Sequence, residues 1–248
     1  MSGHSKWANI KIRKGKQDAI KGVVYTKLAK LIAIAARDGG SDPSSNAKLK
    51  EAIAKAKANN MPNDRIDRAM KKGAGELSNS NFETITYEGY GAGGIAVIVE
   101  ALTDNKNRTA GEVRHIFDKH GGNLGTSGCV SYMFERQGSI LVASEAEIGE
   151  ETLMDLALEA GAQDFISNED GYEIITSPAG FQAVFDAIEN AGIPTVQAEI
   201  AMNPTIETEI ADIEIVKRFM KMLDMFESND DVQEVYHNAL LPEEAQEM

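Results

Sequence analysis

GSILVASEAEIGEETLMDLALEAG, residues 138–161, and QDFISNEDGYEIITSPAGFQAVFDAIENAGIPTVQAEIAM, residues 163–202, alternate between two hydrophobic periodicities. The short runs GSILVAS, QDFIS, YEIITS and TVQAEIAM predict strands, whereas EETLMDLALEAG and AGFQAVFDAIENAG predict amphipathic helices. The resulting order of elements, β-α-β-β-α-β, is that of a ferredoxin-like fold. We therefore expect residues 138–202 to form a nearly complete folding unit.

The segments on either side of this unit predict a second sheet. Before it come the strand FETITYEG, the strand IAVIVEAL, the helix TAGEVRHIFDKHGG with a capping box at Thr109 and Glu112, and the strand SYMFERQ. After it come a long helix, about residues 208–227, and the strand VQEVYHN. A lone helix and strand cannot form a core, so we expect them to return to the sheet of residues 82–136, which makes the ferredoxin-like unit an insertion.

Residues 1–77 predict a small helical domain with a thin core. In YTKLAKLIAIAARDGG, apolar residues recur at i, i+3, i+4 and i+7 from Leu28, and two shorter helices follow, one capped near Asn46 and one starting near Pro62. The polar stretch GAGELSNSN then marks a linker. The chain is thus predicted to be a multi-domain α+β protein with a three-to-four-helix bundle over 1–77, a discontinuous α+β middle domain over 78–137 plus 203–248, and an inserted acidic ferredoxin-like domain over 138–202.

Charge is distributed unequally along the chain. The formal net charge is −14, but residues 1–72 carry 17 Lys and Arg against 6 Asp and Glu, a net of +11, and the remaining residues carry 8 against 33, a net of −25. Such asymmetry favours a basic module for nucleic acid on an acidic body. The alternative is a Lys-rich helical domain whose charges are only solvated.

Composition also indicates the compartment. No apolar run approaches the roughly 18 residues of a membrane-spanning helix, and no apolar segment follows the basic N-terminus as it does in a secretory signal. The single Cys129 cannot form an intrachain disulfide, which fits a reducing compartment. We therefore expect a cytoplasmic protein without a membrane partner.

The N-terminal arm GHSKWANIKIRKGKQDAIKG, residues 3–22, gathers basic side chains around the one tryptophan of the chain. Basic side chains neutralise phosphates, and a flat ring such as Trp7 or His4 can stack on a base or sugar, which is worth ~1–3 kcal/mol per base. For Trp7 the alternative is an anchor that pins the arm to the bundle, and both interpretations stay open. The residues predicted to bind nucleic acid are His4, Lys6, Trp7, Lys11, Arg13, Lys14, Lys16, Lys21, Lys27 and Lys30.

A second basic cluster lies in the acidic part of the chain, within LTDNKNRTAGEVRHIFDKHGGNLG. It contains Lys106, Arg108, Arg114 and Lys119. The first two precede a predicted helix whose N-terminus attracts anions, so the cluster is a candidate for a second phosphate contact. Alternatively, Arg114 and Asp118 are four residues apart and pair with each other.

No constellation typical of catalysis stands out. GYGAGG, residues 89–94, matches G-x-G-x-x-G, but a strand follows it, which favours a hairpin turn over a dinucleotide site. His115 and His120 are five residues apart and do not share a helical face, so a zinc site has weak support. Cys129 fits a small buried residue better than a nucleophile. We predict no catalytic residue, no metal ligand and no cofactor.

Several stretches resemble the YebC/PmpR family: GHSKWANIK, KANNMP, KKGAGE, YEGYG, LTDNKNRT and VRHIFDKHGGNLGTSGCVSYMF. The resemblance covers the whole length in order and implies three domains, no enzyme activity and a role in regulating gene expression. Members carry the label of DNA-binding transcriptional regulators, and other members act at the ribosome to relieve stalling, including at proline runs. A mitochondrial relative is the translational activator of cytochrome oxidase. Carried over, the resemblance places the nucleic-acid contacts on His4, Lys6, Trp7, Lys11, Arg13 and Lys14, with Lys106, Arg108, Arg114 and His115 as a second signature.

The chain departs from the family pattern at Ile12, where His is usual, and at Val23, where Lys or Arg is common. Loss of a contact at Ile12 would lower the affinity for nucleic acid or the ribosome. Two targets compete, duplex DNA and structured RNA such as ribosomal RNA. The sequence has no standard helix-turn-helix recognition helix, which favours RNA. Two other function classes stay open, a protein-binding adaptor that uses the acidic domain and a nucleic-acid enzyme that uses carboxylates with a divalent ion.

Overall fold

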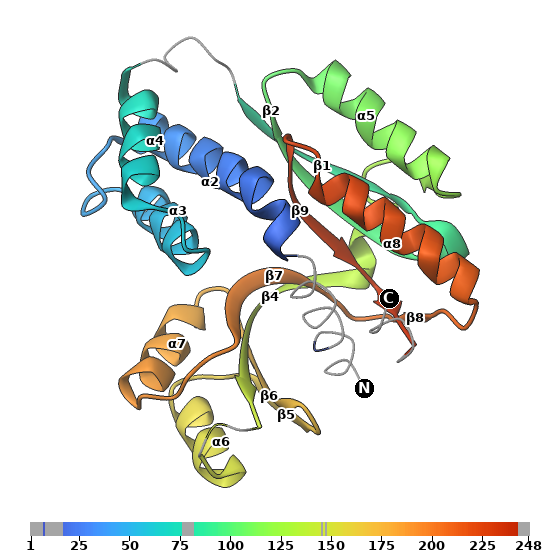
Figure 1. Ribbon diagram of the computed structural model, residues 1–248. Coiled ribbons are helices and arrows are strands. Elements are labelled where there is room, and N and C mark those ends of the chain that lie inside the picture. The colour runs from blue at the N-terminus through green and yellow to red at the C-terminus, as the bar shows by residue number, and fades with distance from the viewer. Residues whose placement is uncertain (1–6, 8–16, 76–81, 145, 147, 243–248) are drawn as a thin grey trace.

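The computed structural model describes Trp7 and residues 17–75, 82–144, 146 and 148–242, with side chains of the first long helix from Gly22 onward. The described chain contains helices and two four-stranded antiparallel sheets in three groups, with a short parallel pair of strands beside them (Figure 1). A helical region comes first, a central sheet carries two helices on one face, and a second sheet carries two further helices. Where the domain boundaries fall between these groups stays a prediction.

The helical region consists of α2 (Gln17–Gly39), α3 (Ala47–Ala58) and α4 (Asn63–Gly75). The predicted cap of α3 is confirmed, because Asn46 Oδ1 accepts the backbone N–H of Leu49 while its Nδ2 donates to the carbonyl of Ala35. Helix α4 lies close against α2, since a Cβ on Gly73 would stand 2.1 Å from the carbonyl oxygen of Ala33. The region thereby encloses a small apolar core of its own.

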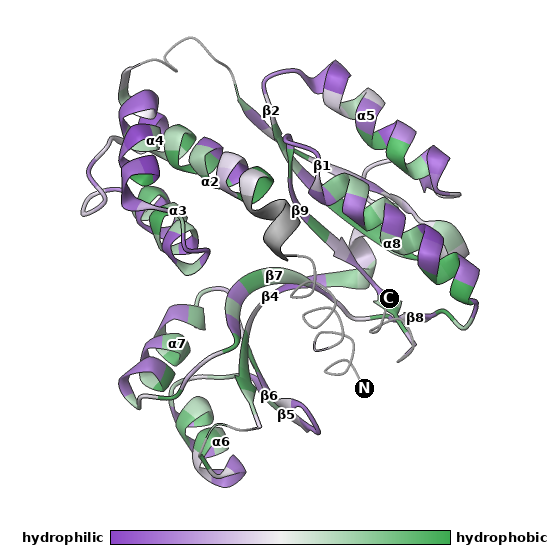
Figure 2. Ribbon diagram, viewed as in Figure 1, coloured by the Kyte–Doolittle hydropathy of each residue, from purple (hydrophilic) through white to green (hydrophobic). Residues whose placement is uncertain are grey.

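The central sheet has the strand order β3-β1-β2-β9, with all neighbours antiparallel. Its strands are β1 (Glu83–Tyr90), β2 (Ala96–Thr103), β3 (Asn123–Leu124) and β9 (Val232–His237). Helices α5 (Lys106–Lys119) and α8 (Ile213–Glu227) cover one face, and both mix polar and apolar residues as one-sided helices do (Figure 2). Strand β9 lies beside β2 although the whole second sheet separates them in sequence.

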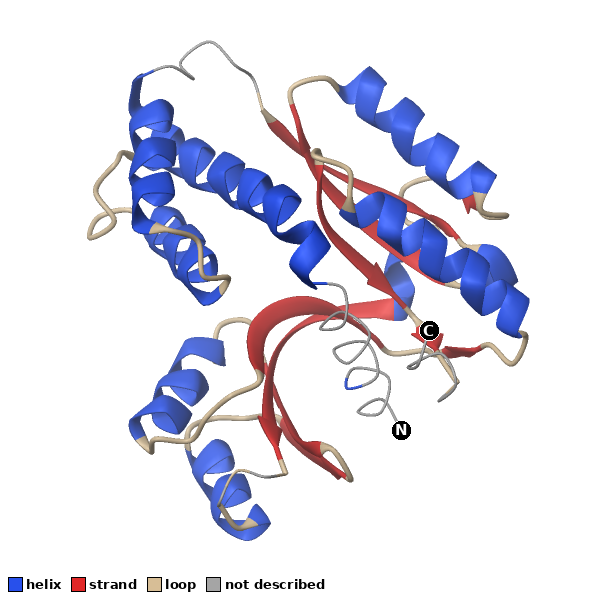
Figure 3. Ribbon diagram, viewed as in Figure 1, coloured by secondary structure: helices blue, strands red, loops and turns tan. Residues whose placement is uncertain are grey.

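The second sheet has the strand order β5-β6-β4-β7 and is also antiparallel. Its elements are β4 (Phe134–Ala143), α6 (Glu150–Glu159), β5 (Asp164–Asn168), β6 (Gly171–Thr176), α7 (Phe181–Asn190) and β7 (Gln197–Pro204). The sequence order is therefore β-α-β-β-α-β. Strands β4 and β7 are long and curved, and they run from the central sheet into the second one (Figure 3).

Three sequence-based boundaries were wrong. Helix α5 begins at Lys106 rather than at Thr109, because the side chain of Asn105 accepts the backbone N–H of Arg108 and caps the helix there. The two strands predicted on either side of residue 137 are one strand, β4, preceded by the short helix η2 (Ser131–Met133). Helix α8 begins only after its cap, Asp212, since the residues before it form β8 (Thr208–Glu209), which pairs with β10 (Ala239–Leu240).

Truncating Phe117 to Ala should lower the free energy of unfolding by about 3–5 kcal/mol. The ring is fully buried and meets Phe226 edge-on with centroids 5.2 Å apart. Chemical denaturation of the full chain measures the change. Tyr132→Ala is the control, because Tyr132 is 68% exposed, and should alter stability by less than about 0.5 kcal/mol. Equal losses for both variants would contradict the described packing.

Candidate nucleic-acid interface

The structure describes only part of the predicted N-terminal interface. Trp7 is 5% exposed, and its indole N–H is buried without a hydrogen-bond partner among the described residues. A ring buried to this degree offers no free face to a base in this conformation, but the apolar cluster of the helical region does not include Trp7, so the anchor interpretation stays a prediction. Lys21 belongs to α2, but its side chain is not described. Outside the described residues lie His4, Lys6, Lys11, Ile12, Arg13, Lys14 and Lys16.

Lys27 and Lys30 on α2 point toward the central region rather than into solvent. The Nζ of Lys30 lies 2.8 Å from Oδ1 of Asp231 and 5.2 Å from the ring centroid of Phe82. The Nζ of Lys27 donates to the backbone carbonyl of Glu227, the last residue of α8, at 2.6 Å. Both ammonium groups are therefore engaged within the chain in this conformation.

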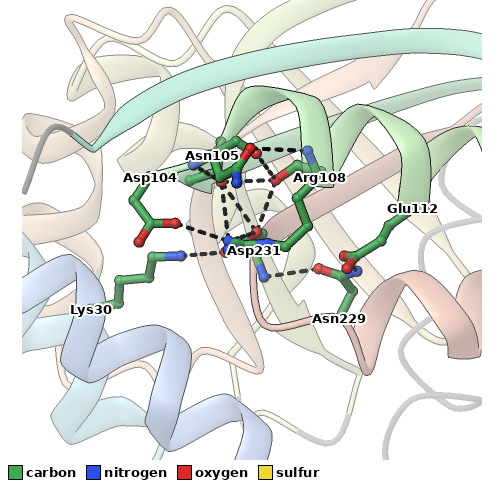
Figure 4. A network of polar contacts seen from close by, with 9 residues as sticks. Lys30, Asp104, Asn105, Arg108, Glu112, Asn229 and Asp231 are labelled. Carbon is green, nitrogen blue, oxygen red and sulfur yellow. Dashed lines mark hydrogen bonds and ion pairs between the residues drawn. The ribbon is translucent and has the colours of Figure 1, made fainter.

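Asp231 joins the first basic cluster to the second (Figure 4). The Nη2 of Arg108 donates to Oδ2 of Asp231 at 2.7 Å and to Oδ1 of Asp104 at 2.9 Å. The hydroxyl of Thr109 lies 2.8 Å from the same Oδ2. Because Lys30 approaches the other oxygen, two cations from distant parts of the sequence meet at one carboxylate, whose side chain is only 9% exposed.

These contacts hold Asp231 in its charged form. Burial raises the pKa of a carboxyl group, but here hydrogen bonds from Arg108, Lys30 and Thr109 outweigh it and lower the pKa of Asp231 to about 2. The hydrogen bonds that Arg108 donates to Asp231 and Asp104 raise the pKa of its guanidinium group. The carboxylate is therefore an anion across the physiological pH range, and its cations stay paired.

The rest of the second basic cluster spreads along α5. The Nζ of Lys106 forms an ion pair with Glu83 at 2.6 Å. Among the described residues, Arg114 and Asp118 form no ion pair, so the structure does not contain the local pairing that was the alternative to a phosphate contact. Exposed on the helix are Arg114, His115 and Lys119. Because a helix rises about 1.5 Å per residue, the cluster from Lys106 to Lys119 extends over roughly 20 Å along α5 rather than forming one compact site.

A basic surface that is not among the predicted binding residues lies on α3 and α4. A groove between the two helices is lined by apolar residues such as Ile53, Ile66 and Met70, and also by Lys50 and Lys57. Some exposed lysines of these two helices have no ion pair or hydrogen bond among the described residues. We call them the outer basic surface: Lys48, Lys50, Lys57, Lys71 and Lys72. Spacing could have shown part of it, since residues seven apart share a helix face.

A buried carboxylate fixes the loop after β3. Glu88 accepts the backbone N–H groups of Gly128, Val130 and Ser131 at 2.7, 2.9 and 2.8 Å. Burial raises the pKa of Glu88, but these donors lower it below its ordinary value. Burial, followed by the charge of Glu88, raises the pKa of the Cys129 thiol. A thiol with a raised pKa is a weak nucleophile, and Cys129 packs at the edge of an apolar cluster.

Other candidate sites in the sequence gain no support from the geometry. The glycine-rich motif, residues 89–94, begins in β1 and continues into the connection to β2 through the short helix η1 (Ala92–Gly94), which confirms its interpretation as a hairpin turn. Over the described ranges, no three His, Cys, Asp or Glu side chains gather as metal ligands would. Among the described helices, none combines the length and apolar character that crossing a membrane requires.

Known proteins are similar to this chain over nearly its full length. Residues 5–76 match a family model described as the TACO1/YebC protein N-terminal domain, and residues 82–239 match one described as the TACO1/YebC second and third domain. A "Probable transcriptional regulatory protein" of Clostridium novyi (strain NT) is 55% identical over 98% of this chain and 99% of its own length. A protein of the same description from Clostridioides difficile (strain 630) is 58% identical over 93% and 96%. A crystal structure of a conserved hypothetical protein from Aquifex aeolicus has a TM-score of 0.79 and 47% identity, with 92% of this chain and 94% of that chain covered.

Replacing Asp231 by Asn should lower the free energy of unfolding by about 2 kcal/mol at neutral pH. A carboxylate whose pKa drops from about 3.9 in the unfolded chain to about 2 in the folded one contributes stability above pH 5, and this contribution is lost as the pH falls toward 2. In urea denaturation, the difference in the free energy of unfolding between wild type and Asp231→Asn should therefore be largest above pH 5 and should decrease below it. A difference that stayed constant down to pH 2 would contradict the assigned contacts.

Proposed function

The chain belongs to the TACO1/YebC family, and we propose that it is a nucleic-acid-binding regulator of gene expression that catalyses no reaction itself. The relatives named as probable transcriptional regulatory proteins support the regulatory role. The observation that carries the nucleic-acid part is the outer basic surface, whose lysines are exposed and, among the described residues, unpaired. Such lysines neutralise phosphates and release counterions, which supplies most of the affinity for nucleic acid.

The charge of the second sheet region supports this placement of the interface. Between Gln137 and Val216 the sequence contains no Lys or Arg, whereas Asp and Glu recur throughout. A field of one sign repels a polyanion from that end of the molecule and directs it to the helical region. The predicted contacts of the N-terminal arm, Lys11, Arg13 and Lys14 among them, belong to the same basic part of the sequence.

We infer structured RNA, ribosomal RNA included, as the target, with duplex DNA as the alternative that the relatives' names favour. The lysines on α3 and α4 are suited to phosphates. Reading bases in a major groove needs free Arg, Asn or Gln side chains at the start of a recognition helix, whereas near the start of α4 Arg65 lies over the ring of Tyr25 and Arg68 pairs with Asp64. Recognition by shape and phosphate contacts is typical of RNA-binding proteins. This choice agrees with a role in relieving ribosome stalling, which the resemblance to the YebC/PmpR family implies.

Co-sedimentation with 70S ribosomes, beside a titration of duplex DNA, separates the two targets. Both are measured over a salt series, because affinities for nucleic acid are interpretable only with the salt concentration. Saturable ribosome binding at physiological salt, with DNA binding that collapses there, is the expected result. Preference for one DNA sequence at fixed salt, without ribosome binding, would instead establish the transcriptional alternative.

Charge reversal of Lys50 and Lys57 to Glu should weaken binding to every RNA sequence alike. Each lost phosphate contact reduces the slope of log K against log salt by roughly 1, so the double variant should lose about 2. Fluorescence anisotropy with labelled RNA across a salt series measures both quantities.

The control for this variant is Arg218→Glu combined with Lys221→Glu, which makes the same change in net charge on exposed positions of α8. The control should leave the slope within about 0.5 of the wild-type value. Equal losses in the two double variants would assign the effect to net charge rather than to the outer basic surface.

A further inference from the structure

Three lysines of the helical region end on one short segment of the central region. This segment, residues 227–234, runs from the last residue of α8 into β9. Each contact joins one lysine to one group of the segment: Lys27 to the backbone carbonyl of Glu227, Lys30 to the carboxylate of Asp231, and Lys55 of α3 to the carboxylate of Glu234. The segment therefore presents a row of anionic or partly negative oxygens to a row of ammonium groups.

Apolar packing makes no comparable contribution to this contact. The apolar cluster of the helical region contains only residues between Val24 and Met70, and the cluster beneath α5 and α8 contains only residues between Tyr87 and Leu241. No apolar cluster of the described residues spans both regions. Parts of a chain that meet through small polar contacts are expected to move relative to each other. The helical region can thus leave the segment without exposing its core.

The segment is the fixed side of the contact. Asp231 is bound by Arg108 and Thr109 of α5, and its backbone carbonyl accepts the N–H of Leu102 on β2 at 2.7 Å. These bonds lie wholly within the central region and do not depend on Lys30. When the two regions separate, the carboxylates stay in place and the lysines are released together with their helices.

We propose that Lys27, Lys30 and Lys55 form a concealed phosphate-binding face. Residues 227–234 mask this face until the phosphates of a nucleic acid replace the oxygen atoms of these residues as partners of the lysines. The inference rests on the proposed function, because it assumes that phosphates bind the helical region at all. The outer basic surface is accessible in the closed form, and the concealed face adds its contacts once the regions separate. A ligand that needs a partly populated open form binds with an apparent affinity reduced by the open fraction. Contacts that keep the lysines masked therefore weaken the binding of nucleic acid, and a substitution that removes one of these contacts strengthens it.

Glu234→Gln tests the mask, because it removes the partner of Lys55 and keeps every described bond of Asp231. The probes are a fluorescein-labelled 20-nucleotide oligouridylate and a 20-base-pair duplex DNA, both titrated by anisotropy. We expect Glu234→Gln to bind the better of the two probes about two- to fivefold more tightly than wild type, which corresponds to one partly exposed ion pair. The control is Glu214→Gln, which makes the same change in net charge but frees only Lys217 on α8. It should bind as wild type does.

A distance measurement separates unmasking from simple relief of repulsion. Spin labels on cysteines at the exposed positions Ala74 of α4 and Asp118 of α5, with Cys129→Ser, report the separation of the two regions by pulsed electron paramagnetic resonance. Saturating oligouridylate should lengthen the distance in the otherwise wild-type chain, and Glu234→Gln should lengthen it without ligand.

The outcomes distinguish the inference from the function on which it rests. Binding of either probe with equal affinity in wild type and Glu234→Gln, and with an unchanged distance, overturns the mask and leaves the nucleic-acid function standing. Absence of binding in wild type and in Glu234→Gln, for both probes and for ribosomes, overturns both. Tighter binding in Glu234→Gln with a longer distance supports the concealed face, including the case in which only the variant binds measurably.

Discussion

One buried carboxylate, that of Asp231, joins the helical region to the central sheet. Removing Asp231 from water costs free energy unless cations and hydroxyl groups replace the lost hydration. Its partners come from α2, from the first turn of α5 and from the end of β2. Their arrangement fixes the turn between α8 and β9 against the turn between β2 and α5, and the helical region meets the central sheet at the same point (Figure 4).

The opposed charges of the two halves act inside the molecule as well as outside it. Lysines on α2 and α3 that would bind any phosphate also bind the carboxylates nearest to them, because both anions satisfy an ammonium group. The lysines of the helical region whose side chains are described are therefore of two kinds. Those that face the central region, such as Lys30, are paired, and those of the outer basic surface, such as Lys50, are exposed. Only the second kind is available without a change of conformation.

Local signals in the sequence were sufficient for the periodic elements but not for the contacts between them. The stripe from Leu28 and the cap at Asn46 depend on neighbours a few residues away, so pattern alone located them. LTDNKNRT, in contrast, offers Asn105 and Thr109 as caps of similar local preference. The choice between them involves Asp231, whose Oδ2 engages Thr109 from 122 residues further along the chain. For the same reason no local pattern distinguished the lysines that are paired within the chain from those that are exposed.

The strength of the contacts at residues 227–234 indicates which ligands can compete for them. Because the pKa of Asp231 is lowered to about 2, its carboxylate stays charged near neutrality, and a change of pH in that range does not release Lys30. A competing anion has to do so, and a single phosphate replaces only one contact while the other two hold the regions together. A nucleic-acid strand presents its phosphates in a row. After one phosphate has bound, its neighbours are therefore held near the remaining lysines at a high effective concentration. Three individually weak contacts thus favour a polymer over its monomers, which is the selectivity that a nucleic-acid-binding protein needs in the presence of free nucleotides.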